Sequence, residues 1–144
     1  MTPFTSLLRR RSLLAAPLLL ALGVPALAAK PAPQVQFVTS MSNFVVELYP
    51  DKAPKTVANF LHYVKSGHYD GTVFHRVIPD FMIQGGGYDA KLIERPARQT
   101  VPHEGRQAYQ AGLRKVSGSI AMARTNDPDS ATAQFFINVK DNGF

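Results

Sequence analysis

Cysteine and tryptophan are both absent from this 144-residue sequence, and charged residues make up only 18% of it. The absence of cysteine excludes a disulfide scaffold, a cysteine nucleophile and any metal site built on thiolates. Hydrophobic residues reach 45%, which is too many for a disordered chain. The length suits one modest domain and is too short for two.

Acidic residues are scarce as well, with 10 Asp and Glu against 16 Lys and Arg. Three of the basic residues, at positions 9–11, lie in an N-terminal segment that looks removable. Without residues 1–28 the balance is 13 basic residues against 10 acidic ones. This mild excess does not indicate a nucleic-acid-binding protein. The basic residues of segment 95–115 are dispersed with few aromatics, which favours a solvated loop.

Residues 1–28 have the three-part layout of a secretory signal peptide. A short basic stretch precedes an apolar run over 13–24, and small residues lead to a candidate cleavage site after Ala28. A membrane anchor is the alternative, but a spanning helix needs about 20 apolar residues, and this run is shorter and interrupted. We therefore expect export and a short linker at 29–33. The pair Arg10-Arg11 keeps both the general secretory and the twin-arginine routes open.

The remaining sequence predicts short strands with one early helix. Apolar side chains recur at i, i+3, i+4 and i+7 after Pro54, which predicts an amphipathic helix over 54–66. Segment 88–115 is polar and lacks a clear period, so we expect a long surface loop with a short strand at 100–103. Strands are predicted at 35–39, 44–49, 72–78, 81–84, 119–123 and 134–139. This pattern favours a mainly antiparallel sheet or barrel.

The sequence stops at Phe144, directly after the turn-like cluster 141–143. About six strands are few for a barrel, which must close to remove its edges. We therefore expect that the domain, residues 34–144, is incomplete at its C-terminus.

The densest group of chemically useful side chains lies in residues 74–86. Strand alternation places Arg76 on the same face as Phe74 and Ile78, and a cation among apolar neighbours is costly without partners. An aromatic ring, a thioether and an amide follow closely, at Phe81, Met82 and Gln84. Together they describe an apolar pocket with one cation and one amide. The alternative is an arginine at a sheet edge that keeps its charge in water.

This segment, with GSIAMA at 118–123 and QFFIN at 134–138, resembles the cyclophilin-type peptidyl-prolyl cis-trans isomerases. The likeness covers about residues 34–144 and is strongest to the periplasmic bacterial branch. It implies that Arg76 is the catalytic arginine. The residues that it places at the substrate are His75, Phe81, Met82, Gln84, Ala123, Arg124, Gln134, Phe136 and Phe144.

The resemblance also implies a mainly β fold, a cyclophilin-like antiparallel β-barrel with a capping helix. The family has eight strands and two helices, so this chain would lack the last two strands and the second helix. The implied protein is a monomer without cofactor that binds proline-containing segments of unfolded or folding proteins. A phenylalanine at Phe144, where many relatives carry tryptophan, implies weak cyclosporin binding.

Two other interpretations compete with an isomerase. A metal site would need the four scattered histidines, which lack the spacing of a zinc motif, so we expect no metal. Asp127 and Asp129 resemble part of a calcium loop but are better explained as a loop cap. A non-catalytic proline-binding or holdase module remains the alternative from another class, because the predicted barrel is incomplete.

Overall fold

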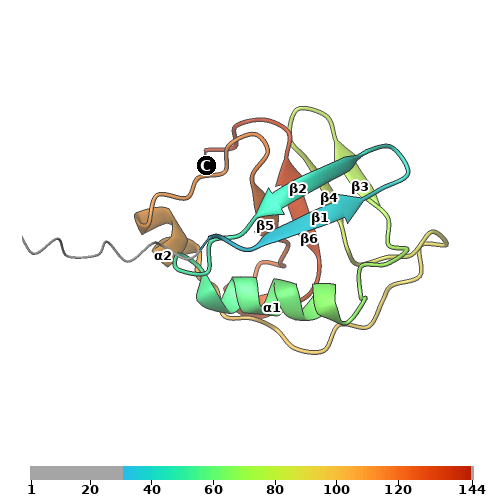
Figure 1. The fold of residues 1–144 in the computed structure, drawn as a ribbon, viewed down its shortest axis with the longest axis horizontal. Coiled ribbons are helices and arrows are strands. Elements are labelled where there is room, and N and C mark those ends of the chain that lie inside the picture. The colour runs from blue at the N-terminus through green and yellow to red at the C-terminus, as the bar shows by residue number, and fades with distance from the viewer. Residues whose placement is uncertain (1–30, 144) are drawn as a thin grey trace, which may run out of the picture. The chain divides into compact units, whose positions relative to one another are not determined.

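Six strands and two α-helices make up the part of the chain that the computed structural model describes, residues 31–143 (Figure 1). The predicted signal peptide and Phe144 lie outside these residues. The strands are β1 (Gln34–Val38), β2 (Asn43–Glu47), β3 (Arg76–Ile78), β4 (Met82–Gly85), β5 (Ile120–Met122) and β6 (Phe135–Asn138). The helices are α1 (Pro54–Lys65) and α2 (Gly105–Gln110), and a short 3-10 helix, η1, spans Pro128–Ser130.

The β1–β2 pair is the antiparallel hairpin that the sequence predicts. Exposed and half-buried residues alternate along both strands, so each strand turns one row of side chains inward. The turn is held by the hydroxyl of Thr39, which accepts from the backbone N–H groups of Met41 and Ser42 and donates to the Ser42 carbonyl. Phe37 and Phe44 lie opposite each other in the register and stack with ring centroids 4.7 Å apart.

Helix α1 begins at Pro54, where a missing N–H costs nothing, and ends one residue before the predicted end. Its buried residues are Val57, Phe60 and Tyr63, which confirms the apolar face. The first turn is capped from a distance by Glu104. The Glu104 carboxylate accepts from the backbone N–H groups of Lys55 at 3.1 Å and Thr56 at 2.7 Å. Burial opposes the charge, but these hydrogen bonds outweigh it and hold the pKa of Glu104 below its ordinary value.

The other four strands form one antiparallel sheet in the order β3-β4-β6-β5. The core lies between this sheet, the hairpin and α1, which runs below both sheets in the view of Figure 1. Its centre is Phe135 on β6, whose ring meets Phe37 edge-on at 5.4 Å and Phe60 at 6.0 Å. Since side chains alternate along a strand, the two neighbours of Phe135 point away from the core.

The mainly β class is confirmed, and the corrections are local. The described strands form two sheets and do not close into a barrel within residues 31–143. The predicted strand at 72–78 is shorter, since Thr72 makes only an isolated bridge to Asp89, and the one at 100–103 is a single bridge at Val101. Segment 88–115 is not wholly loop, because it contains α2. No helix of the described residues is long and apolar enough to cross a membrane.

Candidate functional site

One row of residues crosses all four strands of the larger sheet. Arg76 lies opposite Gln84, Gln84 opposite Phe136, and Phe136 opposite Ala121. Residues opposite each other in antiparallel strands share a face. Because Phe135 points into the core, the row that contains Phe136 lies on the other face. The sheet therefore brings together three of the predicted residues from segments up to 60 positions apart.

Hydrogen bonds link the polar members of this face into a chain. The Arg76 guanidinium donates through Nη1 to Gln84 Oε1 at 3.3 Å, and Gln84 Nε2 donates to Gln134 Oε1 at 3.0 Å. Gln134 thus fixes the orientation of the Gln84 amide, whose oxygen then faces the arginine. A guanidinium has five N–H donors, so this bond leaves most of them available. Arg76 itself is exposed on β3, an edge strand of the sheet.

Apolar side chains flank this polar chain. Met82 lies two residues before Gln84 on the same strand face, and only 2% of its surface is exposed. Phe136 is half-buried beside Gln84. Phe81 is half-buried at the turn that enters β4, and its N–H donates to the Ile78 carbonyl at 3.2 Å. The predicted combination of an apolar wall, a cation and an amide is therefore present.

Two of the predicted residues, Ala123 and Arg124, follow β5, and only Ala123 is hydrogen-bonded to a residue of this face. The backbone N–H of Ala123 donates to the Gln134 carbonyl at 2.9 Å, which places Ala123 beside the end of the hydrogen-bonded chain. Arg124 is exposed, and its guanidinium donates to the neighbouring Thr125 carbonyl at 2.8 Å. Arg124 does not join the hydrogen-bonded chain at Arg76. Phe144 lies outside the described residues.

His75 directly precedes β3, and its ring packs against that of Tyr88. The two ring centroids are 4.5 Å apart. Nδ1 of His75 is buried, with no hydrogen-bond partner in residues 31–143. Burial lowers the pKa of His75, and the positive charge of Arg76 lowers it further. The Val73 backbone and the charge of Glu94 raise this pKa but do not outweigh the burial. The imidazole is therefore biased to its neutral form.

A buried polar network supports the face from β6, and the sequence analysis missed it. Asn138 is 1% exposed and donates to Ser119 Oγ at 2.9 Å, while its Oδ1 accepts from Asn142 Nδ2 at 2.7 Å. Asn142 Nδ2 also donates to the Phe81 carbonyl at 2.9 Å. The network therefore ties the turn that carries Phe81 to the C-terminal end of β6. An asparagine inside an apolar strand was the available signal, since buried amides need partners.

Gly87 is the second supporting feature that the sequence did not reveal. A Cβ built on Gly87 would lie 2.5 Å from both Cγ and Cδ of Gln134. A run of three glycines, such as that at 85–87, is by its sequence alone typical of a flexible turn. At Gly87 its role is instead to let the Gln134 side chain approach the backbone, and this contact holds the outer end of the hydrogen-bonded chain.

The loop at 127–129 confirms the interpretation as a cap. Asp127 accepts from the backbone N–H of Asp129 at 3.0 Å, at the start of η1, and Asp129 accepts from the His103 N–H at 2.8 Å. Within residues 31–143, no three His, Asp or Glu side chains come together as a metal-binding group. The side chains gathered on the sheet face are one fixed cation, two amides and an apolar wall. Such a set can bind and polarise an amide.

Known proteins with similar sequences share one activity name. The family model for "Cyclophilin type peptidyl-prolyl cis-trans isomerase/CLD" matches residues 34–144. The isomerase cyp18 of Streptomyces antibioticus is 56% identical over 110 residues, which are 76% of this chain and 64% of that protein. Isomerase B of Escherichia coli is 47% identical over 110 residues, 76% of this chain and 65% of that protein. The chain thus spans less than two thirds of the length of these relatives.

Solved structures agree with the sequence comparison. The cyclophilin AquaCyp293 of Hirschia baltica superposes with a TM-score of 0.66 at 27% identity and covers 80% of this chain and 60% of its own. A cyclophilin-type isomerase of Cryptosporidium parvum, crystallised in the presence of the dipeptide Ala-Pro, gives 0.61 at 26% identity, with 77% and 70% covered. With the family match over residues 34–144, these likenesses show that the chain belongs to the cyclophilin-type peptidyl-prolyl cis-trans isomerase family.

Proposed function

We propose that this chain accelerates cis–trans rotation about X–Pro peptide bonds. The observation that carries the proposal is the hydrogen-bonded chain from Arg76 through Gln84 to Gln134, set beside Met82 and Phe136 on one face of the sheet. Relatives at 47–56% identity carry the same activity in their names, which supports it. The alternative of a non-catalytic proline-binding or holdase module is not favoured.

The reaction needs no bond to break. Rotation about an X–Pro bond has a barrier of about 20 kcal/mol, and at the transition state the amide is twisted by about 90°, so its resonance is lost. The proline nitrogen then regains its lone pair. A donor directed at this lone pair stabilises the twisted amide more than the planar one, which is the requirement for catalysis. Arg76 supplies such a donor, because a guanidinium carries five N–H groups and no acceptor.

One hydrogen bond does not account for the whole acceleration. A hydrogen bond to a charged group contributes about 1.5–3 kcal/mol, whereas an acceleration of ~10⁵ needs roughly 7 kcal/mol. The apolar wall supplies the second contribution, because the planar amide is more polar than the twisted one and is disfavoured in an apolar pocket. Met82, Phe136 and Phe81 hold the proline ring while the acyl side rotates. Gln84 fixes the peptide backbone through its oriented amide.

The proposed substrates are proline-containing segments of unfolded or folding exported proteins. The layout of residues 1–28 as a signal peptide supports export to the periplasm, and the structural relative studied with Ala-Pro supports proline peptides as ligands. Peptide mass determination after secretion checks the cleavage expected behind Ala28. We also propose a monomer that binds cyclosporin weakly, the latter because Phe144 replaces a tryptophan.

Replacement of the arginine tests the proposal. Arg76→Ala is expected to lower kcat/KM at least ~100-fold, near 2.7 kcal/mol, in a protease-coupled assay on an Ala-Pro peptide. Arg106→Ala is the matched control, since Arg106 is an exposed arginine on α2 away from the sheet face. A folded Arg76→Ala variant with unchanged activity would remove this residue from the mechanism.

A further inference from the structure

Asn142 is the only asparagine of this sequence that is followed by a glycine, Gly143. Such a pair is prone to deamidation, because glycine has no side chain to shield its backbone nitrogen. That nitrogen attacks Cγ of the asparagine side chain, ammonia leaves, and a cyclic imide forms. Water then opens the imide at either carbonyl and leaves aspartate or isoaspartate. The segment after β6 therefore carries a pair of residues that can react with no reagent other than water.

The fold holds Asn142 in an arrangement that opposes this reaction. The residue is 6% exposed, and its Nδ2, the group that must leave, donates to the Phe81 carbonyl at 2.9 Å and to Asn138 Oδ1 at 2.7 Å. Its backbone N–H donates to the Lys115 carbonyl at 2.7 Å. Attack on Cγ requires the side chain to turn toward the Gly143 nitrogen, which would break both hydrogen bonds of the amide. The folded network therefore protects Asn142 against deamidation.

The surroundings of Asn142 allow this protection to be lost by local opening. Lys140, Asp141 and Gly143 are exposed, and residues 139–143 form neither helix nor strand. The Gly143 N–H has no acceptor within residues 31–143. Local opening requires the least free energy where few contacts are broken, so this segment can open while β6 stays paired. We therefore expect deamidation to proceed from the open form.

The product of the reaction does not fit the place of the asparagine. An ionised carboxylate has acceptors only, and it would face the Phe81 carbonyl and Asn138 Oδ1, which are acceptors as well. A buried charge without partners is costly. The segment after β6 would therefore stay open once Asn142 has reacted, and the turn that carries Phe81 would lose its support.

We propose that Asn142 is a deamidation site that the folded network protects, and that its conversion permanently weakens the site face at Phe81. The converted fraction then records how long the segment after β6 has been open. The chemical step is independent of the proposed isomerase activity, whereas its effect on KM rests on that activity. The rate of conversion and the thermal melt are therefore measured beside the kinetics.

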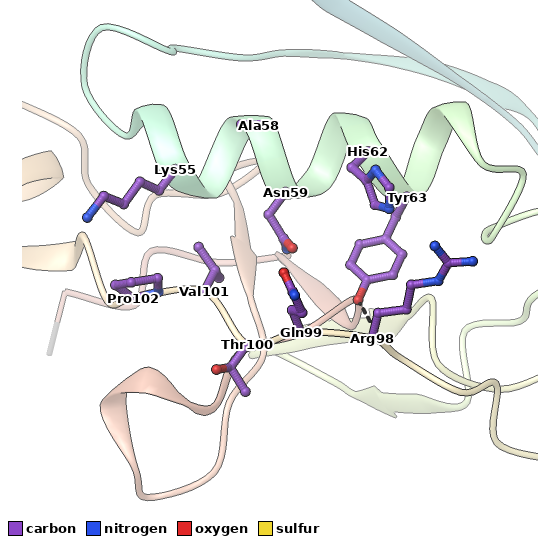
Figure 2. A pocket seen from close by; sticks show the side chains of 10 residues that line it. All are labelled: Lys55, Ala58, Asn59, His62, Tyr63, Arg98, Gln99, Thr100, Val101 and Pro102. Carbon is purple, nitrogen blue, oxygen red and sulfur yellow. Dashed lines mark hydrogen bonds between the residues drawn. The ribbon is translucent and has the colours of Figure 1, made fainter.

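Peptide mass spectrometry of the full chain, incubated in mildly alkaline buffer with and without guanidinium chloride, tests the protection. We expect aspartate and isoaspartate to form at position 142 at least about tenfold faster in the denaturant, where the network is absent. Asn59 is the internal control, and it lies on α1 beside the cavity between this helix and segment 98–102 (Figure 2). Its Nδ2 also donates to a backbone carbonyl, that of Thr132 at 2.7 Å. Because the bulky Phe60 follows Asn59 and hinders the attack, Asn59 should stay intact in both samples.

Variants connect the chemistry with the site. Gly143→Ala should slow the conversion because its methyl group shields the nitrogen, and nothing lies within 4 Å of the added Cβ. Asn142→Asp reproduces the product and should raise KM for an Ala-Pro peptide about three- to tenfold and lower the melting temperature. The matched control Asn126→Asp adds the same charge at an exposed position and should do neither. After long incubation the natural chain should approach Asn142→Asp, whereas Gly143→Ala should not.

Three results would overturn the proposal. They are equal rates of conversion with and without denaturant, conversion of Asn59 as fast as that of Asn142, and an Asn142→Asp variant whose melt or, in an active chain, whose KM is unchanged. If the unmodified chain shows no isomerisation, the proposed function fails, while the conversion rates and the melt still decide this inference.

Discussion

Two adjacent phenylalanines of β6 belong to two different environments. Phe135 lies in the core, where its ring meets four aromatic neighbours at centroid distances between 5.4 and 6.0 Å. Phe136 lies one position on, on the opposite face, beside Gln84 and Ala121. The core face is held by apolar contact. The site face is held by hydrogen bonds between polar side chains, so that its geometry is fixed although Arg76 is exposed.

The two faces of the same sheet thus differ in what they carry: one packs the core, and the other carries the proposed site. Substitutions on the core face should lower the free energy of unfolding and affect activity only through the folded fraction. Substitutions on the site face, or on the groups that hold it, should change kcat/KM at a smaller cost in stability. A core-face variant that lowered kcat/KM more than its folded fraction explains would contradict this separation.

The largest expected effect is on the core face. Phe135→Ala removes the central ring of the aromatic cluster and should lower the free energy of unfolding by about 3–5 kcal/mol. Its matched partner Phe136→Ala, at a half-buried position, should cost less stability but should lower kcat/KM by at least about tenfold. Urea unfolding and the isomerisation assay on the same samples check both values. Equal stability losses in the two variants would contradict the assignment of the faces.

The Asn138 network comes next in size. Asn138→Ala removes the hydrogen bonds that Asn138 makes with Ser119 Oγ and Asn142 Nδ2, and at about 0.5–1.5 kcal/mol each their loss should cost about 1–3 kcal/mol. Because Asn142 also holds the Phe81 carbonyl, KM for an Ala-Pro peptide should rise as well. Urea unfolding and steady-state kinetics measure the two effects. If KM is unchanged while stability falls, the network supports the fold alone and does not position Phe81.

Gly87→Ala tests the site face with little disturbance of the core. The new Cβ would meet the Gln134 side chain at 2.5 Å, and this flexible side chain can move aside at small cost. Gln134 would then release the Gln84 amide, so we expect a loss in kcat/KM of about tenfold, near 1.4 kcal/mol, with a smaller change in unfolding free energy. Gly143→Ala is the control, because nothing lies within 4 Å of its added Cβ. Unchanged activity of Gly87→Ala would show that Gln134 does not orient Gln84.

The smallest expected effect is at the first turn of α1, and it involves neither face of the sheet. Glu104→Gln replaces the carboxylate that caps α1 and should cost about 0.5–1 kcal/mol at neutral pH. The pKa of Glu104 is lower in the folded protein than in the unfolded one. Its contribution to the stability of the fold is therefore fully present above the unfolded pKa of about 4.3, and it is lost as the pH falls through the folded pKa. Thermal melts from pH 7 to pH 3 should therefore show the difference between the two proteins shrink as the pH falls. A difference that stayed constant over this range would exclude the charge as its cause.

The elements with strong periodicity could be predicted from the sequence pattern. The site residues were predicted from the resemblance to a family. The helix after Pro54, the hairpin and the strand around Phe135 follow from local pattern, and the structure confirms them within one or two residues. Helix α2 was missed because its six residues begin with glycine, contain no buried side chain and depend on tertiary context.

The supporting contacts of the site were beyond sequence reasoning for a physical reason. The contact between Gly87 and Gln134 joins positions 47 residues apart, and no local preference of either residue encodes it. The bond from Asn142 to the Phe81 carbonyl spans 61 positions. Such contacts depend on strand register, which periodicity alone does not determine. The side chains of the proposed site were recognisable by type, whereas the groups that hold them appear only in the folded arrangement.

The most direct test of the central claim is a protease-coupled isomerisation assay on the purified chain, with a circular dichroism melt of the same sample. We expect a cooperative melt together with acceleration of Ala-Pro isomerisation that Arg76→Ala reduces at least ~100-fold. A chain that melts cooperatively but leaves the uncatalysed rate unchanged would contradict it.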